Sequence, residues 1–134
     1  MKGTMERRAL QAAMLLGSLV PLLAGGAGML HGLAMVGGVS GEVPANLDSH
    51  FRYLSGLLCG LGIGFASCIP HVETKGRRFR LLGAVVLVGG VGRAVSLLAV
   101  GQPGLAHQLA LGMELGVMPL LMLWQWRVER GRSG

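Results

Sequence analysis

Hydrophobic residues along the chain fall into four long stretches separated by short polar connections. The stretches cover about residues 9–36, 50–69, 79–100 and 105–126. Each is close to or longer than the ~20 residues that a helix needs to cross a bilayer. Short connections place consecutive helices side by side and antiparallel. The pattern predicts an all-α fold, a membrane-embedded four-helix bundle built from residues 1–134 as one domain.

The composition supports a membrane protein. Hydrophobic residues make up 51% of the chain and charged residues only 13%, whereas roughly a quarter is charged in an average soluble protein. The 24 glycines lie mostly within the apolar stretches. Small residues at such positions let membrane helices approach closely. Membrane lipids are therefore the first expected partners.

Positive charge is distributed unevenly along the sequence. Ten of the 12 Lys and Arg residues precede the first stretch, separate the second from the third, or follow the fourth. The connections at residues 37–48 and 101–104 contain none. By the positive-inside rule, both termini are expected in the cytoplasm. The net charge of +6 does not indicate nucleic-acid binding, because no basic face is interleaved with aromatic residues.

The first stretch also has features of a cleavable signal peptide. A basic start is followed by an apolar run and by small residues over positions 24–28. However, hydrophobicity continues through Leu33-Ala34-Met35-Val36, so we expect a retained span. The mass of the purified protein separates the two cases.

Glycine spacing predicts where helices touch. Gly56, Gly60 and Gly64 recur every four residues, and Gly112 and Gly116 form a second pair. These faces are expected to seat a neighbouring helix, either within the chain or in a homo-oligomer. Cys59 and Cys68 lie nine residues apart on one predicted helix, roughly 13 Å along its axis, which is too far for a mutual disulfide.

An arginine and a glutamate interrupt the third and fourth stretches. Arg93 and Glu114 each lie about ten residues from the break at Gly101-Gln102-Pro103-Gly104, so an antiparallel turn brings them to similar depth. An unpaired charge at that depth costs at least several kcal/mol. We therefore expect an intramembrane ion pair. It is either a clamp between two helices or a site where Arg93 anchors a ligand and Glu114 orients it or handles a proton.

Other polar residues share the same predicted half of the bundle. Asp48 precedes Arg52 by four residues, the order that favours an ion pair on one helical face. Asp48 or Ser49 is expected to cap the second helix. With Arg93 and Glu114, a polar network or ligand-binding cavity open to the outer face is predicted. Its other expected members are Asp48, Arg52, His31, Ser96 and His107. The histidines lie on separate segments without metal-ligand spacing, so no metal is predicted.

The segments Asn46-Leu47-Asp48-Ser49-His50-Phe51-Arg52-Tyr53-Leu54-Ser55-Gly56, Gly89-Gly90-Val91-Gly92-Arg93 and Met113-Glu114-Leu115 with Pro119 resemble a bacterial family of small four-helix membrane proteins. That family is known only as a domain of unknown function and is loosely similar to the DoxX-like group. The resemblance implies a four-helix fold in the bacterial inner membrane, with Asp48, Arg52, Arg93 and Glu114 at family positions. It implies no activity.

Three functions remain open at this point. The leading one is a polar, outward-facing site at Arg93 and Glu114 that binds a small amphipathic or anionic ligand, such as a lipid headgroup or a quinone. A second is a small membrane isomerase or oxidoreductase subunit with Glu114 as acid/base. A third is an accessory subunit of a larger membrane complex. No catalytic residue is assigned, and no cofactor is identified.

Overall fold

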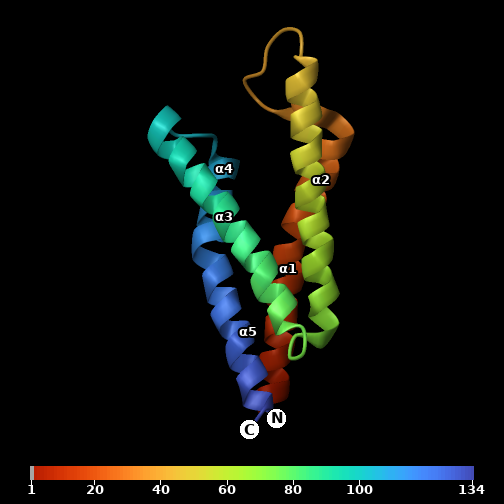
Figure 1. Ribbon diagram of the computed structural model, residues 1–134, viewed down its shortest axis with the longest axis vertical. Helices are drawn as coiled ribbons and strands as arrows, with labels where there is room; N and C mark the ends of the chain where they lie inside the picture. Colours follow the sequence, from red (N-terminus) through yellow and green to blue (C-terminus); the bar gives the residue numbers. More distant parts are fainter. Residues whose placement is uncertain (1) are drawn as a thin grey trace. The chain divides into compact units, whose positions relative to one another are not determined.

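The computed structural model describes residues 2–134, and all its regular elements are helical (Figure 1). Four helical segments are long and apolar enough to cross a membrane, which confirms the all-α, four-span prediction. In chain order the elements are α1 (Lys2–His31), η1 (Gly32–Met35), α2 (Ala45–Cys68), η2 (Ile69–His71), α3 (Gly76–Val100), α4 (Leu105–Gly112), η3 (Met113–Val117) and α5 (Met118–Arg132). Segments η1 and η2 are 3-10 turns, whereas η3 is π-helical.

The chain forms two compact units. One is Ala12–Ile69, which holds most of α1 together with α2. The other joins Met1–Gln11 to Pro70–Gly134, and so contains α3, α4 and α5. Each unit is described by itself below, and the assignment of residues 1–134 to a single domain stays a prediction.

The second helix begins earlier than expected. It starts at Ala45, preceded by Pro44, and no side chain caps it. The backbone N–H groups of Leu47 and Asp48 both donate to the carbonyl of Pro44. The predicted cap at Asp48 or Ser49 is therefore wrong. Pro44 has the fixed φ that suits the start of a helix, and the Asp48 carboxylate is left for another partner.

Close packing of α1 on α2 depends on glycines that the four-residue pattern did not select. A Cβ atom on Gly25 would lie 2.5 Å from the backbone nitrogen of Cys59, and one on Gly62 would lie 2.7 Å from Cγ of Leu22. By contrast, Gly60 has no atom within 4 Å of that position, and Gly56 meets only the Met29 side chain. The predicted stripe is therefore wrong as the contact face with α1, because the helices cross about half a turn away from it, and contact with a second copy of the chain stays a prediction.

Helices α3 and α5 meet along a different glycine pattern. Gly76, Gly83 and Gly90 follow each other at seven-residue intervals, and a Cβ atom on any of them would collide with α5 or η3 side chains. A seven-residue repeat keeps one face against an antiparallel neighbour. Gly112 and Gly116, the predicted close-approach pair, have open space instead. Both cysteines are free, as expected, with Cys68 buried.

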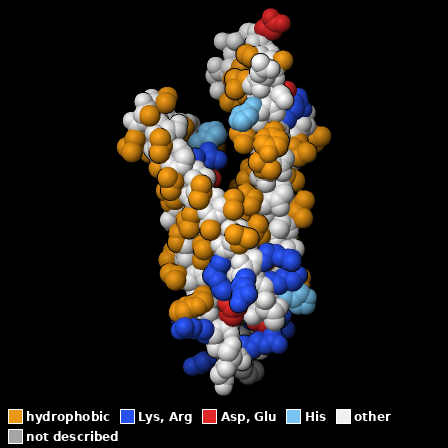
Figure 2. Space-filling model, viewed as in Figure 1, with side chains coloured by type: hydrophobic (Ala, Val, Ile, Leu, Met, Phe, Trp, Pro, Cys, Tyr) orange, Lys and Arg blue, Asp and Glu red, His pale blue; other side chains and the backbone are white. Residues whose placement is uncertain are grey.

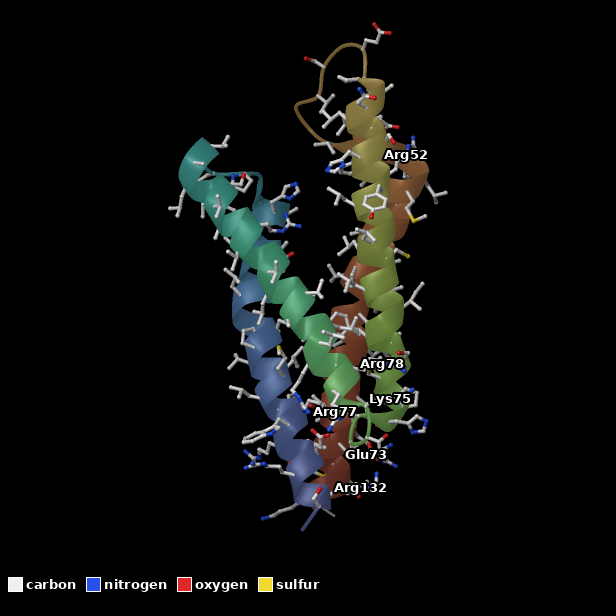
Figure 3. The ribbon with its side chains drawn as sticks, in the orientation of Figure 1. Arg52, Glu73, Lys75, Arg77, Arg78 and Arg132 are labelled. Carbon is white, nitrogen blue, oxygen red and sulfur yellow. The ribbon has the colours of Figure 1, made fainter. Side chains whose placement is uncertain are left out.

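Charged residues gather at one end of the unit that contains α3, α4 and α5, where α3 begins and α5 ends (Figure 2). We call this the basic end. Glu73, in the turn before α3, accepts a hydrogen bond from Nε of Arg7 at 3.1 Å and pairs with Arg132 at 3.0 Å. Figure 3 labels Glu73 and Arg132 at this end. These contacts explain why helix α1 extends to Lys2 and α5 to Arg132, beyond the predicted spans.

The neighbours of Glu73 lower the pKa of its carboxyl group. Burial alone would raise its pKa, but hydrogen bonds from its own backbone and from Arg7, with the charges of Arg7 and Arg132, outweigh burial. The pKa of Glu73 is therefore held below its ordinary value. The residue stays ionised and ties the turn before α3 to α1 and α5.

Candidate functional site

The position of Glu114 is set by an irregular turn in the last span. Residues Met113–Val117 are π-helical, and the backbone N–H of Met118 donates to the carbonyl of Met113, five residues earlier. Pro119 follows at once and has no N–H for the carbonyl of Leu115. Local π-helical turns accommodate such a proline inside membrane helices, and they occur frequently at functional sites.

A glycine on α3 brings that turn close. A Cβ atom on Gly90 would lie 2.7 Å from Cδ2 of Leu115 and 3.0 Å from Cβ of Glu114. Arg93 comes one helical turn later on α3, on nearly the same face. In the sequence Gly89-Gly90-Val91-Gly92-Arg93, only Gly90 is in such close contact, since Gly89 and Gly92 face open space.

Arg93 and Glu114 form the expected salt bridge. Nε of Arg93 lies 3.0 Å from each carboxylate oxygen and donates a hydrogen bond to Oε1. About a third of the Arg93 side chain (36%) is exposed, compared with 19% for Glu114. The guanidinium is therefore held at its Nε edge, and the Arg93 side chain as a whole stays partly accessible.

His107, on α4, holds a second nitrogen of the same guanidinium. Its Nδ1 lies 2.9 Å from Nη1 of Arg93. A guanidinium has five N–H donors and no acceptor, so Nδ1 must be the unprotonated ring nitrogen that accepts this bond. Arg93, Glu114 and His107 thus form one cluster, and the third nitrogen, Nη2, makes no hydrogen bond with any residue among 2–134.

One atom of the cluster is buried without a hydrogen bond. Oε2 of Glu114 is covered by protein atoms, and no N–H is directed at it despite the nearby Nε. A buried polar atom left in this state is unusual in native structures. Because Oε2 is covered and the Arg93 side chain is partly exposed, Arg93 is the more accessible member of the pair.

Asp48 and Arg52 form a separate arrangement in the first unit, which we call the clasp. Oδ2 of Asp48 accepts from Nε of Arg52 at 2.8 Å, and Oδ1 accepts from the backbone N–H of Leu33 at 2.7 Å. Nη1 of Arg52 donates to the carbonyls of Met29 and Leu30 at 2.6 and 3.1 Å. Carbonyls at a helix end lack intrahelical donors, so the clasp satisfies the end of α1 and fixes its turn into η1.

The remaining predicted members join neither cluster. His31 and Ser96 are exposed, and neither side chain makes a hydrogen bond within the described part of the chain. Between residues 2 and 134, no group of three or more His, Cys, Asp or Glu residues could hold a metal ion. A single cavity lined by all four helices stays a prediction.

One buried polar group escaped the sequence reasoning. Gln125, on α5, is fully buried, donates from Nε2 to the carbonyl of Val72, and accepts from Nη1 of Arg80 at 2.8 Å. The same Nη1 donates to Glu129 at 2.7 Å. Gln125 and Glu129 are four residues apart, so they share a helical face. The four-residue spacing of Gln125 and Glu129 in the sequence was the signal that could have indicated a shared partner such as Arg80.

A model of one protein family matches residues 9–125 of the chain. Its description is "Domain of unknown function (DUF4345)". The chain belongs to the DUF4345 family. The match covers two spans fully and most of the first and fourth, and it includes the clasp and the Arg93 cluster. No curated protein and no solved structure matches the chain. Membership in the DUF4345 family confirms the resemblance to a family of unknown function and assigns no activity.

Proposed function

We propose that this DUF4345 protein binds a small amphipathic ligand at the Arg93 cluster, with the ligand's polar head at the free edge of the guanidinium. The observation that carries the proposal is the unused Nη2 donor. Nε and Nη1 of Arg93 are occupied by Glu114 and His107, and Nη2 is not. Within a membrane span, a donor without an acceptor is costly, so a ligand oxygen is the natural partner.

The charge balance of the cluster indicates the type of ligand head. Arg93 is already paired with Glu114, so the cluster attracts a strongly charged anion less than a lone arginine would. Three of the five guanidinium N–H groups remain, two on Nη2 and one on Nη1, and a carbonyl or phosphoryl oxygen can accept from them. A quinone and a lipid headgroup both provide such an oxygen on a hydrophobic body.

We also propose a location and an orientation. Ten of the 12 Lys and Arg residues flank the spans on one predicted side, which favours a bacterial inner membrane with both termini in the cytoplasm. Reporter fusions after Gly134 and within the 37–44 loop test this orientation. Activity of a periplasm-specific reporter at the C-terminus would refute it.

Native mass spectrometry of gently extracted protein tests the ligand proposal. The wild type should retain a bound small molecule, and Arg93→Gln should retain at least tenfold less while keeping its helical circular dichroism. Arg127→Gln is the charge-matched control, because Arg127 pairs with Glu6 at the basic end. The mass and absorption spectrum of the extracted molecule distinguish a quinone from a lipid.

The structural clamp predicts a different result. Arg93→Gln and Glu114→Gln would each destabilise the protein, the double variant would recover stability, and ligand retention would follow the folded fraction. The enzymatic alternative requires Glu114 to act on the ligand. In that case Glu114→Gln would keep the bound molecule but change its chemical identity between product and substrate.

A further inference from the structure

A groove lies between α3 and α5, on the side of Arg93 that leads toward the basic end. It has a volume of about 360 Å³ and is lined by Arg80, Leu87, Pro119, Met122, Leu123 and Trp126. Arg80 is the one charged member, and the others are nonpolar. It is therefore an open, hydrophobic groove with one cationic side chain in its lining.

The dimensions of the groove match one lipid chain within one leaflet. Arg80 and Leu87 are seven residues apart on α3, which is about 10 Å along the helix axis. Pro119 and Trp126 have the same separation on α5. One leaflet contributes about 15 Å of hydrocarbon. An acyl chain entering at the basic end would thus remain beside the groove through most of its leaflet.

Further arginines lie at the mouth of the groove. Cζ of Arg130 is 3.9 Å from the ring centroid of Trp126, a cation–π contact that holds the guanidinium over a groove residue. Arg77 is exposed and lies near the start of α3 (Figure 3). It precedes Arg80 by three residues, which places the two on nearly the same helical face. Within residues 2–134, neither Arg77 nor Arg130 pairs with an acidic side chain.

The net charge at the mouth is positive. Glu129 is acidic, and its carboxylate pairs with Nη1 of Arg80 at 2.7 Å. Arg77 and Arg130 are left uncompensated. A nonpolar groove alone would not discriminate between lipids, because every acyl chain is equally hydrophobic. The excess positive charge of these arginines favours a negatively charged headgroup.

We infer that this groove binds one anionic phospholipid, with an acyl chain along α3 and α5 and the phosphate at Arg77, Arg80 and Arg130. The groove includes none of the three residues of the Arg93 cluster, namely Arg93, Glu114 and His107. Figure 2 shows Lys and Arg side chains gathered at the basic end and hydrophobic side chains over the helices beyond it.

The test is lipid titration of the full chain, delipidated in detergent, by native mass spectrometry. Phosphatidylglycerol should bind in a one-to-one complex at least tenfold more tightly than phosphatidylcholine. Arg77→Gln and Arg130→Gln should each weaken phosphatidylglycerol binding about fivefold, as expected for one basic residue near a headgroup. Neither change removes a salt bridge within the described chain, so folding should persist.

Two control variants make the result specific. Arg127→Gln removes the same charge at the same end, but Arg127 pairs with Glu6 and does not line the groove. Leu123→Trp should fill the groove and reduce binding, whereas Leu98→Trp, at another exposed apolar position, should not. Equal binding of the two lipids, or equal losses in Arg77→Gln and Arg127→Gln, would refute the site. Arg93→Gln should leave this titration unchanged, so the two proposals fail independently.

Discussion

The clasp and the Arg93 cluster are each built on an arginine–carboxylate pair, yet they leave different atoms free. In the clasp, both Asp48 oxygens accept hydrogen bonds, and Arg52 donates to two backbone carbonyls. Nη2 makes no hydrogen bond within residues 2–134 in either arginine, but only the cluster also has a buried carboxylate oxygen without a partner, Oε2 of Glu114. The clasp connects side chains to the backbone of the adjacent helix, whereas the cluster connects side chains only.

This difference separates a structural arrangement from a binding site. An ion pair in which both the carboxylate and the guanidinium bond to backbone groups holds a chain turn in place. A pair with free donors costs stability in the membrane unless something fills it. The clasp should therefore affect folding most, and the cluster should affect binding most.

The largest effect is expected from the clasp. Asp48→Ala leaves the Leu33 N–H and the Arg52 guanidinium without their acceptor, and should lower the free energy of unfolding by about 2–3 kcal/mol. Equilibrium unfolding in mixed detergent measures this. Glu42→Gln, in the exposed connection before α2, is the control and should change little. A loss no greater than that of Glu42→Gln would remove the structural role.

A substitution at Gly32 tests the structural role of the clasp in a second way. The φ of Gly32 is +65°, and a Cβ atom there would collide with Asp48 and Arg52. Gly32→Ala should lose about 2 kcal/mol, because the cost of left-handed backbone, about 1 kcal/mol, adds to the disruption of the clasp. Gly38→Ala is the matched control, since Gly38 also has positive φ but open space around it. Equal losses in the two variants would show that only backbone conformation matters.

The cluster should be less sensitive in folding. Arg93→Gln and Glu114→Gln should each lower the free energy of unfolding by about 1 kcal/mol, because part of Arg93 is exposed and Oε2 is already unsatisfied. A double-mutant cycle measured by unfolding should give a smaller coupling energy than one for Asp48 and Arg52. A larger coupling would reverse the comparison and favour the clamp.

Glu73 provides the smallest effect and a reference outside the spans. Its lowered pKa means that the folded state binds the proton less readily than the unfolded state. The stabilisation is thus present at neutral pH and is lost as the pH falls below about 4.5 and through the folded pKa. Glu73→Gln should remove less than about 1 kcal/mol of acid-dependent stability. Unfolding curves at pH 7 and pH 4 measure this contribution in the wild type and in Glu73→Gln. If the stability difference between the two pH values is the same in both proteins, Glu73 does not contribute to the acid dependence.

Much of the fold followed from local properties of the sequence. Four apolar stretches of sufficient length predicted four helices, since a bilayer span requires continuous internal hydrogen bonding. The Asp48–Arg52 and Arg93–Glu114 pairs also followed from the sequence, the first from four-residue spacing and the second from equal distance to a turn. Each of these two predictions depended only on residues within one helix or one helical hairpin.

The glycine contacts did not follow, because they depend on how helices cross. A four-residue glycine stripe is available for contact, but the rotation of each helix about its axis decides whether Gly60 or Gly62 is used. That rotation results from the sum of many side-chain contacts. The seven-residue series Gly76, Gly83 and Gly90 was legible in the sequence, yet nothing local distinguished it from the open pair Gly112 and Gly116.

By itself, the sequence determined the helical class, the apolar spans and which charges had to find partners in them, because hydropathy and charge are properties of each residue. Only the tertiary structure decided what each charge does. In the folded chain Asp48 accepts a hydrogen bond from the backbone of Leu33, His107 bonds to Arg93, and the buried Gln125 bonds to Arg80. Hydrogen bonding requires distances and directions of a few tenths of an ångström, and those arise only when the helices are packed.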